Sequence, residues 1–127
     1  MNITEDYVSF EVAKLLKEKG FHEPCIATYN STTKNFQVEE IYEDWTIHWK
    51  GYISVPTQQM AMKWLREVHK LHIGIARGPK GYHITIETIP LGVVKYITKE
   101  IVGTTYVNSY EKAVEAALKY CLEKIIK

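Results

Sequence analysis

The sequence predicts an α+β protein with a mainly antiparallel sheet and three helices. Three stretches repeat apolar residues at helical spacing, and the segments between them are rich in branched and aromatic residues. Turn-forming residues separate several of these segments at hairpin distances. The expected order is α-β-β-β-α-β-β(-β)-α, in which the number of strands between residues 90 and 108 is left open.

All 127 residues are expected to form a single domain. The chain is 46% hydrophobic and 12% aromatic, which is enough for one core, and it contains no internal repeat, low-complexity tract or linker. Two domains of half this length would each be too small to be stable alone.

The first helix is expected to begin after Ser9, a favourable N-cap, and to end at Gly20, which suits the left-handed position after a helix. Residues 25–29 favour a strand, residues 30–33 favour a turn, and residues 36–42 favour a return strand. These three segments predict a hairpin.

Residues 45–55 are again rich in aromatic and branched side chains, but Gly51 interrupts them, so one bent strand or two short strands fit equally well. Pro56 or Thr57 then begins a second helix. The apolar side of this helix is expected to face the sheet and consists of Met60, Ala61, Trp64, Leu65 and Val68.

Residues 71–77 and 82–89 alternate in polarity around a Gly-Pro-Lys-Gly turn, which predicts a second hairpin. If Arg77 lies opposite Tyr82, the apolar residues of one strand lie opposite the apolar residues of the other. It gathers the four isoleucines on a core face: Ile73, Ile75, Ile84 and Ile86. The other face then pairs His72 with Glu87, Gly74 with Thr85, and Ala76 with His83, with a shallow depression over the two small residues of the first strand.

Residues 93–107 fit one or two further strands. The last helix is expected to begin after Ser109, with an apolar stripe of Tyr110, Val114, Ala117, Leu118, Cys121 and Ile125. On its polar side, Glu115 with Lys119 and Glu123 with Lys127 form pairs at i,i+4 spacing.

The composition excludes several classes of function. The formal net charge of +1 gives no global attraction to nucleic acid or membrane, and no apolar run is long enough to cross a bilayer. The first ten residues carry acids where a secretion signal would carry lysines, so we expect a cytoplasmic protein. Cys25 and Cys121 fall within apolar runs and are expected to be buried, reduced thiols.

The candidate ligand-binding residues are Arg77, Lys80, His72, His83, Glu87, Trp45 and Trp49. The glycines beside Arg77 and Lys80 would allow a phosphate to approach the backbone amides and the two cations of the turn. An ordinary hairpin turn without a ligand explains the same residues. Trp45 and Trp49 could stack on a flat ligand, or they could belong to the core. The histidines with Glu87 are also the only basis for a weaker alternative, hydrolytic or transfer chemistry.

A second alternative is nucleic-acid binding by a basic helix ridge of Lys63, Arg66 and Lys70, which also fits an ordinary solvated helix face. His69 and His72 form an H-x-x-H, but the helix is expected to end between them and no third ligand has a diagnostic spacing. We therefore expect no metal and no cofactor, and no motif supports an enzyme.

Three stretches, VSFEVAKLLKEKGF, VPTQQMAMKWLREVHKLHI and SYEKAVEAALKYCLEKI, resemble small uncharacterised proteins of phages and prophages of gut bacteria. The resemblance covers both ends and the middle helix. It implies a phage context and a binding role in the host cytoplasm, such as an anti-defence protein that engages a nucleotide-like ligand or a host protein. It brings no catalytic residues. The balanced charge and the lack of a long apolar run lead us to expect no membrane partner, and self-association is left open.

Overall fold

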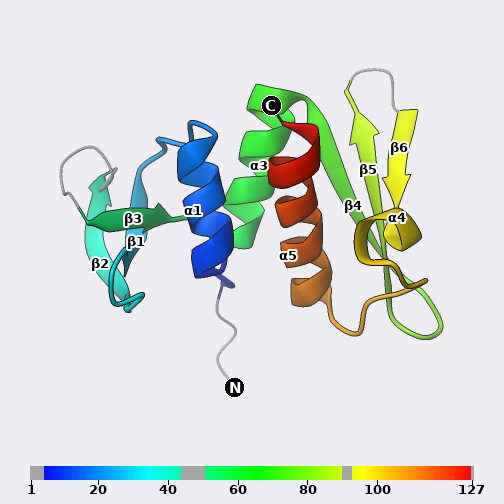
Figure 1. Cartoon of the computed structure of the whole chain (residues 1–127), viewed down its shortest axis with the longest axis horizontal. Coiled ribbons are helices and arrows are strands. Elements are labelled where there is room, and N and C mark those ends of the chain that lie inside the picture. The colour runs from blue at the N-terminus through cyan, green and yellow to red at the C-terminus, as the bar shows by residue number, and fades with distance from the viewer. Residues whose placement is uncertain (1–4, 44–50, 90–92, 127) are drawn as a thin grey trace. The chain divides into compact units, whose positions relative to one another are not determined.

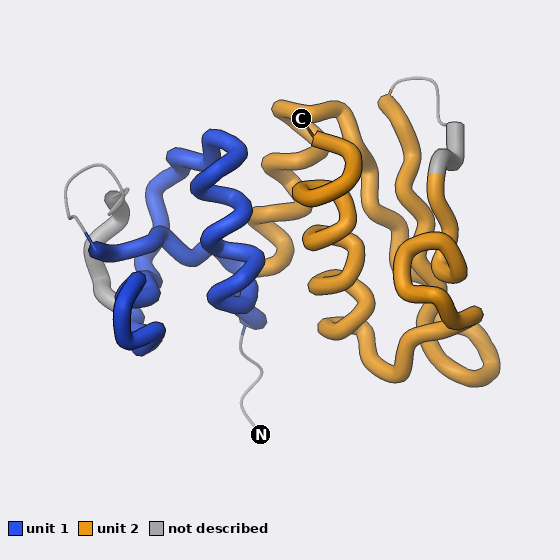
Figure 2. Tube along the Cα trace, viewed as in Figure 1, with its two compact units in different colours: residues 1–57 blue, residues 58–127 orange. Residues whose placement is uncertain are grey.

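The computed structural model describes residues 5–43, 51–89 and 93–126. The chain divides into two compact units, residues 1–57 and 58–127 (Figure 2). The α+β class is confirmed: helices and two three-stranded antiparallel sheets are present, one sheet in each unit (Figure 1). Whether the two units fold together as a single domain stays a prediction.

The first unit contains helix α1 (Phe10–Glu18) and strands β1 (Cys25–Asn30), β2 (Phe36–Glu43) and β3 (Tyr52–Val55). Its sheet has the order β2-β1-β3, so β1 is central and pairs with both neighbours. The hairpin of β1 and β2 is confirmed. Its turn is held by Asn30, whose Oδ1 accepts hydrogen bonds from the N–H groups of Thr32 and Thr33, both at 2.9 Å.

Both predicted ends of α1 are confirmed. Ser9 Oγ accepts a hydrogen bond from the Val12 N–H at 3.2 Å. At the other end Gly20 has a φ of 96°, and the N–H of Phe21 donates to the Leu16 carbonyl at 2.9 Å. The N–H of Gly20 donates to the Lys17 carbonyl at 3.2 Å, which completes a Schellman motif.

The second unit contains helix α3 (Gln58–His69), strands β4 (Leu71–Arg77), β5 (Tyr82–Thr88) and β6 (Val93–Ile97), the short helix α4 (Thr98–Val102), helix α5 (Tyr110–Tyr120) and a π-helical turn η1 (Cys121–Ile125). The strands form a meander in the order β4-β5-β6, and α3 and α5 lie side by side on one face of it (Figure 1). The predicted element order is confirmed, with α4 and η1 as additions.

The register of the β4–β5 hairpin agrees with the prediction at every pair from His72 opposite Glu87 to Arg77 opposite Tyr82. On the face that packs against the helices, Ile73, Ile84 and Ile86 are buried, while Ile75 is half-buried. The alternation of polarity therefore identified the core face of this hairpin.

The buried face of α3 differs from the prediction. Val68 is 54% exposed and Met60 is only half-buried, whereas Met62 and Gln58 are buried. Gln58 is polar, but its Nε2 donates a hydrogen bond to the Glu111 carbonyl at 3.0 Å, which satisfies it inside the unit. The buried face of α3 is thus rotated toward Gln58, a polar residue that an apolar pattern does not include.

Helix α5 is capped as predicted, because Ser109 Oγ accepts from the Lys112 N–H at 3.1 Å. Val114, Ala117, Leu118 and Cys121 are buried as expected, while Tyr110 and Ile125 are only half-buried. Lys127, the predicted partner of Glu123, lies outside the described residues, so that pair stays a prediction. Within the described residues, Glu123 forms an ion pair with Lys119 at 3.7 Å.

Both cysteines are free and buried, as predicted. Burial raises the pKa of the Cys121 thiol to about 12, so this group is a neutral thiol at physiological pH. None of the helices in the described ranges combines the length and the apolar character that crossing a membrane requires.

Candidate ligand-binding site

The β4–β5 loop is a tight turn with a histidine packed against it. The N–H of Gly78 donates to the Gly81 carbonyl at 2.6 Å and closes the loop. A side chain at Gly78 would collide with the imidazole of His83, so this ring lies directly against the glycine backbone. The absence of a side chain at Gly78 therefore allows the His83 ring to pack there.

Residues 104–107 form a second wall beside this loop. The N–H of Tyr82 donates to the Val107 carbonyl at 2.8 Å, and the N–H of Val107 donates back to the Tyr82 carbonyl at 2.9 Å. A Cβ at Gly81 would lie 2.5 Å from the Val107 oxygen, so only glycine permits this approach. Thr104 Oγ1 donates to the Tyr106 carbonyl at 2.9 Å, which orders the segment further.

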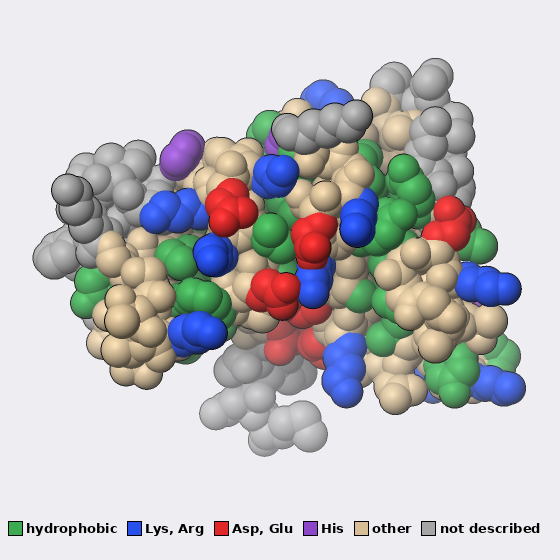
Figure 3. Space-filling view, in the orientation of Figure 1, with side chains coloured by type: hydrophobic (Ala, Val, Ile, Leu, Met, Phe, Trp, Pro, Cys, Tyr) green, Lys and Arg blue, Asp and Glu red, His purple; other side chains and the backbone are tan. Residues whose placement is uncertain are grey.

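A surface pocket of about 170 Å³ lies between the two walls. Its lining residues are Pro79, Lys80, His83, Thr105 and Tyr106. The pocket therefore offers an ammonium, an imidazole, a hydroxyl and a phenol ring within one small concavity. Figure 3 shows Lys or Arg side chains beside hydrophobic ones at the corner of unit 2 where the β4–β5 loop lies.

Of the residues predicted to bind a ligand, Lys80 and His83 come together in this pocket. Arg77 does not join them, because it belongs to the opposite face of the hairpin. Its guanidinium lies over the Tyr82 ring, 5.2 Å from the centroid, and Tyr82 packs edge-on against Tyr110 at 5.9 Å. Arg77 thus makes a cation–π contact within the unit.

His72 and Glu87 are cross-strand neighbours, but they lie toward the other end of the hairpin. The pair of Gly74 and Thr85 separates them from His83, and four residues of strand span about 13 Å. The expected depression over Gly74 is filled, since a Cβ there would lie 2.6 Å from Thr85 Oγ1. The three titratable side chains do not form one constellation.

Trp45 and Trp49 lie outside the described residues, so their role as stacking residues stays a prediction. The basic ridge of α3 is described: Lys63 is exposed and Arg66 is half-buried. Lys70 has a φ of 56°, and its Nζ donates to the Glu67 carbonyl at 3.0 Å. This ammonium caps the C-terminal turn of α3, which leaves fewer free cations than the sequence indicates.

The H-x-x-H is divided as predicted, since α3 ends at His69 and β4 begins at Leu71. Within residues 5–43, 51–89 and 93–126, no three His, Cys, Asp or Glu side chains lie close enough together to hold a metal ion.

Thr105 and Tyr106 were not among the predicted site residues. Their segment is rich in β-branched and aromatic residues and was expected to form strand, although Gly103, Thr104 and Thr105 are a turn-forming sequence. Comparisons with known protein families, curated proteins and solved structures found no match.

Proposed function

We propose that the protein is a non-catalytic binding protein and that the pocket at the β4–β5 loop takes a nucleotide-like ligand. The observation that supports this proposal is the convergence of Lys80, His83 and Tyr106 on one concavity. An ammonium and an imidazole can donate hydrogen bonds to a phosphate, and a phenol ring offers a face to a flat base.

The walls of the pocket favour binding because they are held before a ligand arrives. Reciprocal backbone hydrogen bonds join Tyr82 to Val107, and the loop is closed between Gly78 and Gly81. Ordering these segments therefore adds little to the entropic cost of binding.

The volume limits which part of a ligand enters. At about 170 Å³ the pocket is smaller than a typical site for a whole drug-sized molecule, which is about 300–1,000 Å³. We expect one phosphate and the adjoining part of the ligand to occupy it, while the rest lies on the surface. In a phage context, such a ligand would be a signalling nucleotide of host defence.

The proposal is tested by thermal unfolding of the purified chain with mono-, di- and cyclic nucleotides, since a ligand at one hundred times its Kd stabilises by about 2.7 kcal/mol. Lys80→Gln is expected to raise Kd about tenfold by removing a charge-assisted hydrogen bond. Arg77→Gln is the matched control, because it removes a cation from the same hairpin on the opposite face.

Two outcomes would contradict the proposal. One is the absence of any shift across the nucleotide panel, which would direct attention to a host protein as the partner. The other is a loss of binding in Arg77→Gln while Lys80→Gln binds normally.

A further inference from the structure

The second unit has another and larger hollow, which shares no residue with the pocket at the hairpin. Its volume is about 270 Å³. Ile101 of α4 lines one side, and the remaining lining residues come from α5 and η1: Ala116, Lys119, Tyr120, Glu123 and Lys124. The hollow therefore lies where the short helix α4 meets the C-terminal end of the chain's last helix.

The helix is distorted at this hollow. The N–H of Ile126 donates to the Cys121 carbonyl at 2.9 Å, a hydrogen bond between residues five apart, and residues Cys121–Ile125 form a π-helical turn. Such turns account for well under about 1% of residues in proteins and occur frequently at functional sites. Two of the lining residues, Glu123 and Lys124, lie within this turn, and Tyr120 directly precedes it.

Part of the lining of the hollow is apolar. Ile101, Ala116 and the ring of Tyr120 provide it, and the Tyr120 ring is itself supported by Tyr96 at a centroid distance of 5.1 Å. Partial burial, followed by the Tyr96, Glu100 and Cys121 groups, raises the pKa of Tyr120. Its phenol is protonated at neutral pH, as that of a tyrosine ordinarily is, and can donate a hydrogen bond.

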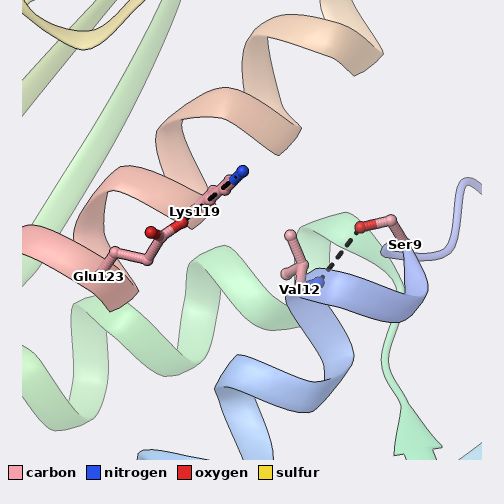
Figure 4. A network of polar contacts seen from close by, with 4 residues as sticks. All are labelled: Ser9, Val12, Lys119 and Glu123. Carbon is pink, nitrogen blue, oxygen red and sulfur yellow. Dashed lines mark hydrogen bonds and ion pairs between the residues drawn. The ribbon is translucent and has the colours of Figure 1, made fainter.

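Two lysines and one carboxylate line the hollow, and a second carboxylate, Glu100, lies near Tyr120. Lys119 and Glu123 form an ion pair at 3.7 Å, which Figure 4 shows along the helix. Lys124 has no such partner among the residues that the structure describes. The Lys124 ammonium is thus the lining cation that remains for a ligand, beside the apolar side chains of Ile101 and Ala116. Glu123 and the nearby Glu100 disfavour a ligand with several negative charges.

We propose that this hollow binds a small organic monocarboxylate with a short apolar or aromatic body. The carboxylate pairs with Lys124 and accepts from the Tyr120 phenol, and the apolar body covers Ile101 and Ala116. This ligand class differs from the multiply charged ligand of the hairpin pocket, with which the hollow shares no lining residue.

The test uses the 127-residue chain labelled with nitrogen-15. Benzoate is titrated into it, and the amide chemical shifts are measured by NMR. Benzamide is the neutral probe of the same shape. We expect benzoate to shift the amides of Ile101, Ala116 and Lys124 with saturation, and benzamide to bind at least about fivefold more weakly. Lys124→Gln should raise the benzoate Kd about tenfold, and Ala116→Leu should fill the hollow and remove saturable binding.

Lys112→Gln serves as the matched control, because Lys112 is an exposed lysine of α5 that does not line the hollow. It should leave the benzoate Kd unchanged. The proposal is overturned if benzoate produces no saturable shifts at millimolar concentration, or if binding persists unchanged in Ala116→Leu with the variant's spectrum otherwise native. Equal affinities for benzoate and benzamide would overturn the ionic part of the assignment.

Discussion

His69 shows how burial changes the chemistry of a single residue. It is the last residue of α3, and its ring packs edge-on against Trp64 at a centroid distance of 4.8 Å. Among the described side chains, its Nε2 is a buried atom without a hydrogen-bond partner. Burial lowers the pKa of His69 below 6.5, because the charged imidazole would lose solvation there.

This shift predicts a pH-dependent stability. Between the folded pKa of His69 and 6.5 the unfolded chain binds more protons than the folded chain, so the free energy of unfolding rises with pH in that interval. The stabilisation is complete above about pH 6.5 and is lost as the pH falls toward the folded pKa. Urea unfolding at pH 7.5 and at pH 5 measures it.

A His69→Leu variant should lose less stability than the wild type between these two pH values. His22→Gln is the control, because its side chain is exposed in the loop before β1. If His69→Leu and wild type lose equal stability on acidification, the assignment of this effect to His69 is wrong.

The candidate site was partly predictable at the level of residues. Lys80 was predicted from the glycine-rich turn, whereas His83 was predicted from the period of two as a member of the face that carries His72 and Glu87. The same register already separates Arg77 from His83 by face, and the structure confirms that separation. Tyr106 was not predicted, because its position depends on a backbone pairing between Tyr82 and Val107 that no local pattern encodes.

At the level of elements, the β4–β5 hairpin depends on glycines that make room for neighbouring side chains. Gly74 is opposite Thr85, whose Oγ1 would lie 2.6 Å from a Cβ at position 74. Thr85 is β-branched and has few alternative rotamers, so a side chain at position 74 forces it to move. The two positions are therefore expected to be energetically coupled.

Gly74→Val should lower the free energy of unfolding by about 1–3 kcal/mol through overpacking. In a Thr85→Ala background the same substitution should cost at least about 1 kcal/mol less, because the competing hydroxyl is gone. A double-mutant cycle by urea unfolding measures the difference. Ala76→Val is the control, since Ala76 is exposed on the same strand and face; additive effects of Gly74→Val and Thr85→Ala would contradict the steric explanation.

The order of the elements followed from periodicity, caps and turns, but α4 did not. Ile101 and Val102 favour strand by propensity, and residues 98–102 are too few for a helical period to be visible. The deciding contact is tertiary: Thr98 Oγ1 accepts from the Ile84 N–H at 2.8 Å. The Thr98 side chain thereby takes the hydrogen bond that a backbone carbonyl of β6 would otherwise accept from β5, and the chain turns from β6 into α4 at this point. The π-helical turn likewise interrupts a stripe that reads as regular helix.

At the level of the whole molecule, the two units can unfold in one cooperative transition or in two separate ones. Neither residues 1–57 nor residues 58–127 exceed about 70 residues, a size at which one core alone gives marginal stability. We therefore expect one unfolding transition for the entire chain.

Tryptophan fluorescence can test this, because Trp64 belongs to the second unit while Trp45 and Trp49 belong to the first. The Trp64→Phe variant keeps Trp45 and Trp49, so its tryptophan fluorescence reports on the first unit. The double variant Trp45→Phe, Trp49→Phe keeps Trp64, so its fluorescence reports on the second unit. In each variant the fluorescence midpoint in urea should coincide with the midpoint from circular dichroism. Separate midpoints within one variant would show that the units unfold independently.

The two sheets also differ in how much chain must be closed into a loop before their strands meet. In the order β4-β5-β6 every pairing joins strands that are consecutive in sequence, whereas in β2-β1-β3 the strand β3 must return past β2 to reach β1. Closing longer loops costs more entropy and slows the formation of a contact. We therefore expect the strands of residues 71–97 to pair faster when the chain refolds, and the addition of β3 to the free edge of β1 to be the slower event.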